Sequence, residues 1–118
     1  MKDLAPDIFR KRLLIEGFYM NDVNVETIKN FFYHITGELS LRTYADPIVH
    51  ATSGTGNEVN QGYDAFVPLI DSGIYIGVWA TKRFLSLIIY TCKDFDDNKA
   101  LRKTKTFFMM NRAEHKLF

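Results

Sequence analysis

Three apolar runs separated by short polar turns constrain the fold more than any other part of this chain. The runs cover residues 63–70, 74–79 and 84–90, and between them lie Asp71-Ser72-Gly73 and Ala80-Thr81-Lys82-Arg83. Apolar runs of this length, bounded by turn residues, are typical of β-strands, and turns this short join antiparallel neighbours. The pattern therefore predicts an antiparallel meander of three strands.

The composition of the three runs suggests their places in the sheet. The run 84–90 is the most apolar, which predicts a central strand. Pro68 has no amide hydrogen to donate, so the run 63–70 is expected at an edge of the sheet or bulged at that residue.

The rest of the chain supplies further elements around this meander. Residues 12–18 predict a first strand, and Asp22 or Asn24 can cap a helix that stops near Gly37. A second helix is expected after Asp94, Asp96 or Asp97. The apolar positions that recur with helical spacing are Val25, Ile28, Phe31, Phe32 and Ile35, and then Ala100, Leu101, Thr104, Phe107 and Phe108.

Three segments give weaker signals. Apolar and polar residues alternate over 39–44, which predicts a half-buried strand that residues 47–49 continue after a break. Residues 52–62 are polar and glycine-rich and predict a mobile loop. The tail 111–118 is polar and is expected to be loosely held.

This order of elements favours a single α+β domain spanning residues 1–118. An antiparallel sheet with two helices on one face forms a two-layer sandwich, and 118 residues suffice for such a core without disulfides or metal. The other face of the sheet then needs a cover, either loops or a second subunit.

Composition excludes several classes of protein. One cysteine forms no internal disulfide, three scattered histidines predict no metal site, and a net charge of +1 implies no nucleic-acid partner. The amino terminus lacks the apolar core of a signal peptide, and no apolar run approaches the length of a membrane helix. We therefore expect a soluble, cytoplasmic protein without a membrane partner.

Ser72 and Cys92 are the residues most open to a chemical role. A serine in a strained turn can attack the preceding carbonyl, and elimination from the resulting ester leaves a pyruvoyl group; a turn serine is the ordinary alternative. The only thiol, Cys92, ends the last apolar run and is either a proton donor or a buried small side chain. Among the histidines, His50 borders the glycine-rich loop and is the best candidate for a site.

The stretch from Tyr63 to Cys92 resembles the prokaryotic S-adenosylmethionine decarboxylases. That family has an apolar strand, Glu-Ser-His, a strand ending His-Thr-Trp, and an apolar strand ending Phe-Thr-Cys; Ser72, Trp79 and Tyr90-Thr91-Cys92 fall in register with it without a gap. The opening strand at residues 12–19 is also similar, and residues 52–62 form an apparent insertion.

The resemblance implies a mechanism and an assembly. In that family the chain cleaves itself before the serine, whose pyruvoyl remnant is the electron sink for decarboxylation. By resemblance, Ser72 is the pyruvoyl precursor, Asp71 supplies the scissile carbonyl and Cys92 is the proton donor. S-adenosylmethionine or a related amino acid would be the substrate, within polyamine biosynthesis, and His50, Asp64, Trp79 and Thr81 would bind it. The family also builds its site between protomers, which implies a homodimer.

Several family positions carry different residues here. The histidine after the serine is replaced by Gly73, and the histidine that assists self-cleavage by Gly77. The serine that helps processing is replaced by Asp64, and the glutamate that binds the ribose by Thr81. Two alternatives therefore stay open: an uncleaved homologue that binds a small ligand or a partner subunit, and a different chemistry that uses Asp64, Asp71, His50 and Cys92.

Overall fold

A computed structural model of the chain describes residues 1–52 and 61–118 and contains six strands and two helices within them. In chain order the elements are β1 (Lys11–Phe18), α1 (Val25–Glu38), β2 (Ile48–Ala51), β3 (Gly62–Leu69), β4 (Ser72–Trp79), β5 (Phe84–Thr91), α2 (Asp97–Phe107) and β6 (Arg112–Leu117).

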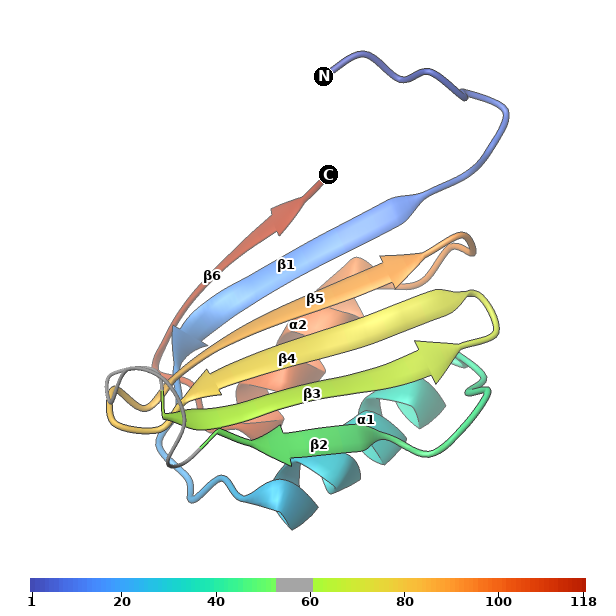
Figure 1. Cartoon of the computed structure of the whole chain (residues 1–118). Coiled ribbons are helices and arrows are strands. Elements are labelled where there is room, and N and C mark those ends of the chain that lie inside the picture. The colour runs from blue at the N-terminus through green and yellow to red at the C-terminus, as the bar shows by residue number, and fades with distance from the viewer. Residues whose placement is uncertain (53–60) are drawn as a thin grey trace.

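The strands form one antiparallel sheet in the order β2-β3-β4-β5-β1-β6 (Figure 1). The predicted meander is confirmed as β3-β4-β5, and β5 lies inside the sheet as its apolar sequence predicted. β3 is not an edge strand, because β2 pairs with it. That pairing stops at Phe66, so Pro68 lies beyond it, and the carbonyl of Pro68 accepts the amide of Tyr44 instead.

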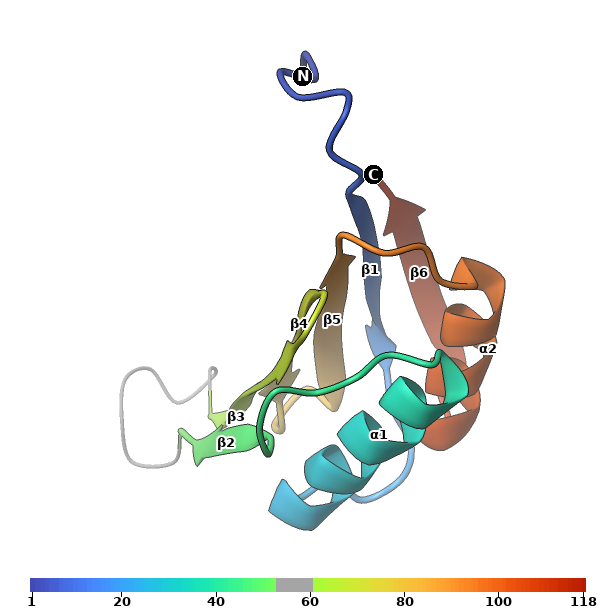
Figure 2. The same cartoon turned by 90° about the vertical axis from the view of Figure 1, so that its right-hand side faces the viewer.

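Both helices pack on one face of the sheet and leave the other face open (Figure 2). The predicted two-layer α+β sandwich is therefore confirmed. Strand residues alternate between the two faces, so that every second side chain enters the core between sheet and helices. The largest fully buried side chains are Phe31, Phe32, Phe108, Leu13, Ile15, Ile28, Ile35, Leu69, Ile74, Ile76, Leu85 and Leu87.

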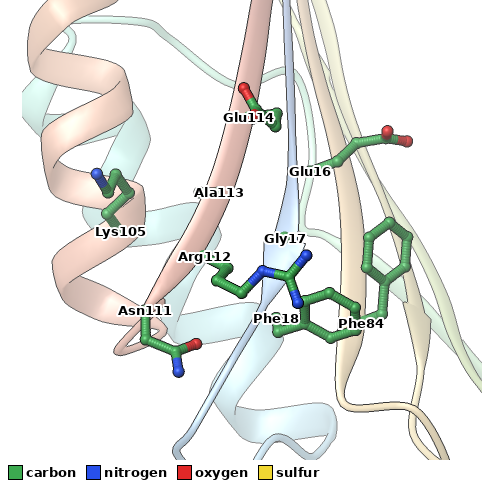
Figure 3. A pocket seen from close by; sticks show the side chains of 9 residues that line it. All are labelled: Glu16, Gly17, Phe18, Phe84, Lys105, Asn111, Arg112, Ala113 and Glu114. Carbon is green, nitrogen blue, oxygen red and sulfur yellow. The ribbon is translucent and has the colours of Figure 1, made fainter.

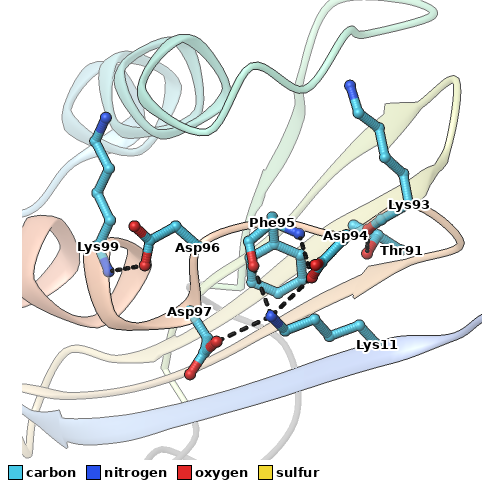
Figure 4. A network of polar contacts seen from close by, with 8 residues as sticks. All are labelled: Lys11, Thr91, Lys93, Asp94, Phe95, Asp96, Asp97 and Lys99. Atoms are coloured by element: carbon cyan, nitrogen blue, oxygen red, sulfur yellow. Dashed lines mark hydrogen bonds and ion pairs between the residues drawn. The ribbon is translucent and has the colours of Figure 1, made fainter.

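Side-chain caps and one lysine fix the helix starts. The Asn24 side chain accepts the amide of Thr27 at the start of α1, and Asp96 accepts the amide of Lys99 at the start of α2. Lys11, at the start of β1, donates to Asp94, Asp97 and the carbonyl of Phe95 (Figure 4). This lysine therefore ties the first strand of the sheet to the segment that begins α2.

The predictions for segments 39–44 and 111–118 were wrong. The alternating segment 39–44 is not a strand, because Leu39 caps the end of α1, Ser40 has a φ of 56°, and only Thr43 forms a bridge, with Leu69. The polar tail is not loose: β6 pairs with β1 along its whole length. An edge strand needs only one partner and few buried side chains, so its sequence is barely apolar. The loop predicted at 52–62 lies mostly outside the described residues, although Thr52 and Gly62 hydrogen-bond to each other.

Candidate functional site

The sheet brings Ser72, Asp71 and Cys92 together at one end of the central strands. Ser72 at the start of β4 pairs with Thr91 at the end of β5. The amide of Cys92 donates a hydrogen bond of 2.9 Å to the carbonyl oxygen of Asp71, the carbonyl that precedes Ser72. Segments about twenty positions apart in sequence thus meet through main-chain hydrogen bonds, as the predicted meander implies.

The backbone of Ser72 is strained. Leu69 pairs directly with Ser72, so Ile70 and Asp71 form a two-residue turn and Ser72 opens the strand, rather than lying in the turn as the sequence predicted. Its φ of 133° lies in a range that glycine adopts readily and other residues rarely. Such a conformation costs about 1–3 kcal/mol, and here it is stored next to the Asp71–Ser72 peptide bond. The Ser72 side chain is exposed.

Asp71 itself is half-buried, with one carboxylate oxygen shielded from water. This oxygen, Oδ2, is fully buried and has no hydrogen-bond partner among the described residues. Buried polar atoms are almost always hydrogen-bonded, so an unpaired carboxylate oxygen beside an exposed serine calls for an explanation.

A depression of about 350 Å³ lies beside Ser72 on the open face of the sheet. No charged side chain lines it; the lining residues are Phe66, Ser72, Gly73, Tyr75, Ile88 and Tyr90. The aromatic members of this set were not predicted from the sequence. The alternation along these strands could have indicated them. Positions that face away from the core carry aromatic side chains here, whereas a solvated sheet face would carry polar ones.

His50 and Asp64 lie in a second depression, of about 300 Å³, farther along the same face. The two residues are directly opposite each other on β2 and β3. The hydroxyl of Tyr75 donates to Asp64 at 2.8 Å, and partial burial together with this hydrogen bond raises the pKa of Tyr75 to about 12. Phe66 and Tyr75 line both depressions, so they join Ser72 to Asp64 and His50 in one strip.

Trp79 and Thr81 are not brought to Ser72. Trp79 ends β4, seven residues from Ser72, which is about 23 Å of extended strand. Its ring packs near Phe84 at 5.6 Å between centroids, and Thr81 follows in the turn.

Aromatic side chains occupy the space beside Gly73 and Gly77, the two glycines at positions where the resemblance implies histidines. A Cβ atom on Gly73 would lie 2.6 Å from the ring of Phe66. A Cβ atom on Gly77 would lie 3.1 Å from the Tyr75 hydroxyl and 3.2 Å from the Trp79 ring. Aromatic packing thus covers both positions where the resemblance implies a histidine.

A further pocket, of about 410 Å³, opens at the far end of β1 and β6, away from Ser72 (Figure 3). None of the residues predicted for the site lines it. Its lining residues are Glu16, Gly17, Phe18, Phe84, Lys105, Asn111, Arg112, Ala113 and Glu114.

In the described part of the chain, no helix has the length and apolar character needed to span a membrane.

Comparisons with known proteins support the fold. No family model and no curated protein matches the sequence. Among solved structures, the chain is similar to the crystal structure of the adenosylmethionine decarboxylase from Aquifex aeolicus, with a TM-score of 0.74 and 18% identity over 94% of this chain and 89% of that one. At this identity the likeness establishes a shared fold, that of an adenosylmethionine decarboxylase, and not membership of its family.

Proposed function

We propose that this protein is a self-cleaving, pyruvoyl-dependent decarboxylase of an amino acid, S-adenosylmethionine or a relative. The observation that carries the proposal is the hydrogen bond from the Cys92 amide to the Asp71 carbonyl, beside the strained and exposed Ser72. A carbonyl held by an N–H donor is polarised for attack and has a ready partner for the charge that develops on its oxygen.

Residues around position 72 fit the formation of a pyruvoyl group there. The Ser72 hydroxyl oxygen bonds to the Asp71 carbonyl carbon, the C–N bond breaks, and the nitrogen takes up a proton, giving an ester of the same mass. Loss of the Ser72 Cα proton then breaks the Cβ–Oγ bond and releases Asp71 as a new carboxyl terminus. Water replaces the nitrogen of residue 72, and ammonia leaves.

The strip that joins the two depressions supports a substrate-binding role for this face. A pyruvoyl group at position 72 would withdraw electrons from a bound amino acid as its carboxylate leaves. Phe66 and Tyr75 offer apolar contacts next to it, and Asp64 and His50 offer polar groups at the distal end of the same strip. Trp79 and Thr81 would contact only a ligand that extends farther along β4.

The thiol of Cys92 is the proposed proton donor to the decarboxylated carbon. It is exposed and lies one residue beyond Thr91, the strand partner of Ser72. A single unpaired cysteine also suits a reducing, cytoplasmic compartment, which we propose as its location.

We further propose that two copies pack through their open sheet faces. Asp64 pairs with Gly77, five residues along β4 from Ser72, so within one chain it lies about 17 Å of strand away. A facing copy would bring such a residue closer and would cover the exposed Ile48, Phe66, Tyr75 and Tyr90. Ile48→Glu should weaken a dimer in sedimentation experiments. The control is Tyr33→Glu on α1, because the side chain of Tyr33 is 53% exposed and that of Ile48 is 52% exposed. A monomer at every concentration would refute the dimer.

Mass spectrometry of the intact protein tests self-cleavage. We expect fragments that end at Asp71 and begin at position 72, and none from Ser72→Ala. Because an accumulated ester has the mass of the intact chain, hydroxylamine, which cleaves esters and spares ordinary amides, should be added in parallel. A single species of 13.7 kDa after both treatments would refute the proposal.

An uncleaved homologue that binds a ligand or partner subunit is the second candidate. The packing of Phe66 over Gly73, and of Tyr75 and Trp79 over Gly77, favours it, because no imidazole is available there to move protons. This candidate predicts one uncleaved species together with calorimetric binding of S-adenosylmethionine or related amines. If the chain also binds none of these and is monomeric, the candidate fails.

A further inference from the structure

Asp71 stands where a proton acceptor for Ser72 is needed. Attack by the Ser72 hydroxyl requires a group that takes its proton, and the positions where the resemblance implies histidines hold Gly73 and Gly77. Aromatic rings already fill the space beside both glycines. Of the three histidines, His50 lies in the second depression. His34 on α1 stacks against Phe107 of α2, and His115 on β6 pairs with Ile15 of β1.

The lysines near this end of the sheet are engaged elsewhere. Lys11 donates to Asp94, Asp97 and the Phe95 carbonyl, and Lys93 donates to the carbonyl of Ser40 at 3.2 Å. A protonated ammonium group accepts no proton in any case. Asp71 is different, because its buried Oδ2 has no partner among the described residues and carries unused lone pairs.

We propose that the side chain of Asp71 is the general base and acid of the acyl shift, a role that rests on the proposed self-cleavage. Oδ2 takes the proton from the Ser72 hydroxyl as the oxygen bonds to the Asp71 carbonyl carbon. The Cys92 amide holds the resulting oxyanion. The Asp71 carboxyl group then returns the proton to the Ser72 nitrogen as the C–N bond breaks, so no external reactant is needed for ester formation.

The proximity of the groups supports this assignment. The carboxyl carbon and the scissile carbonyl belong to the same residue, and the attacking hydroxyl belongs to the next one. Their encounter is therefore intramolecular, and a base of this kind contributes about 10²–10⁴-fold to a proton-transfer step.

The test is the rate of hydroxylamine-dependent cleavage of the whole protein, followed by intact mass. Asp71→Asn keeps the size of the side chain but removes the base, and we expect cleavage at least about 100-fold slower. Asp71→Glu restores a carboxylate and should recover most of the rate. Asp46→Asn, an exposed carboxylate outside the site, makes the same charge change and should cleave like the parent protein.

A second variant guards against misfolding. Asp71→Ala removes the carboxylate, and added acetate should restore part of its cleavage in proportion to the acetate concentration, which a purely structural defect would not allow. If the parent protein cleaves and Asp71→Asn cleaves equally fast, the role of Asp71 is refuted while the proposed function stands. If the parent protein does not cleave even with hydroxylamine, both proposals fall.

Discussion

The amide of Cys92 lies 2.9 Å from the carbonyl oxygen of Asp71, and this contact joins the end of β5 to the hairpin that precedes Ser72. In the proposed mechanism, the backbone of Cys92 and its thiol therefore have separable roles. There the amide serves the cleavage of the chain, and the thiol serves the later protonation of the decarboxylated substrate.

Cys92→Ala separates these roles. The variant keeps the amide, so self-cleavage should proceed within about threefold of the parent rate, whereas decarboxylation should fall at least about 100-fold because the proton donor is missing. Intact mass and release of carbon dioxide from S-adenosylmethionine measure the two steps. Equal decarboxylation by variant and parent would remove the thiol from the mechanism.

Gly73 and Phe66 should be energetically coupled. A methyl group on Gly73 meets the Phe66 ring at 2.6 Å, so Gly73→Ala should cost about 1 kcal/mol of unfolding free energy as the ring is displaced. In a Phe66→Ala background the cost should disappear, because the space is empty. Urea denaturation of the parent protein, the two single variants and the double variant gives the coupling free energy. Additive effects would show that the Phe66 ring moves aside without cost.

Gly17 should control the attachment of β6. A Cβ atom on Gly17 would collide with the carbonyl oxygen of Arg112 and lie 2.8 Å from the Cα atom of Ala113, and both are backbone atoms that move only if the strand moves. We expect Gly17→Ala to cost about 1–3 kcal/mol and to raise hydrogen exchange in residues 112–117. Unchanged protection there would contradict the tight pairing. Gly37→Ala, with nothing within 4 Å, is the control.

Loss of the ion pairs of Lys11 should contribute to unfolding of the protein in acid. The hydrogen bonds of Lys11 hold the pKa values of Asp94 and Asp97 below their usual range. Depressed carboxyl pKa values stabilise the fold above the unfolded value of about 3.9, and this stability is lost as pH falls through the folded values. Burial alone would lower the pKa of Lys11, but the two aspartates raise it overall. Lys11→Met should therefore flatten the decline in stability below pH 4.

The matched control for that titration is Lys2→Met, because Lys2 is exposed and makes no ion pair among the described residues. Its acid limb should follow that of the parent protein. If the unfolding free energies of Lys11→Met and Lys2→Met fall equally steeply with decreasing pH, the ion pairs of Lys11 do not contribute to acid unfolding.

The hydroxyl of Tyr75 should lose its proton at a higher pH than an ordinary tyrosine. Burial and the hydrogen bond to Asp64 raise its pKa to about 12, and Asp64→Asn should move it back towards about 10 because the charge is gone. Since a raised tyrosine pKa favours the neutral form in the folded state, this contribution to stability is complete below pH 10 and is lost towards pH 12. Tyrosinate absorbance, with Tyr75→Phe to assign the transition, measures the shift.

Local pattern in the sequence determined the two helices, the β3-β4-β5 meander and the resulting sandwich. Apolar periodicity indicates which side of each element is buried, and capping residues mark where the helices begin. A turn as short as the one between β3 and β4 leaves only an antiparallel pairing. The pairing also brought Ser72 and Cys92 to the same end of the sheet, because strand lengths fix which residues meet.

The tertiary structure alone decided the rest. β6 exists because β1 has a free edge, and the polar sequence 112–117 carries little sign of it. The ring of Phe66 over Gly73 comes from a neighbouring strand, and the burial of the unpaired Asp71 oxygen depends on how the chain packs around the turn. Such relationships arise only when distant segments pack, and no local pattern in the chain encodes them.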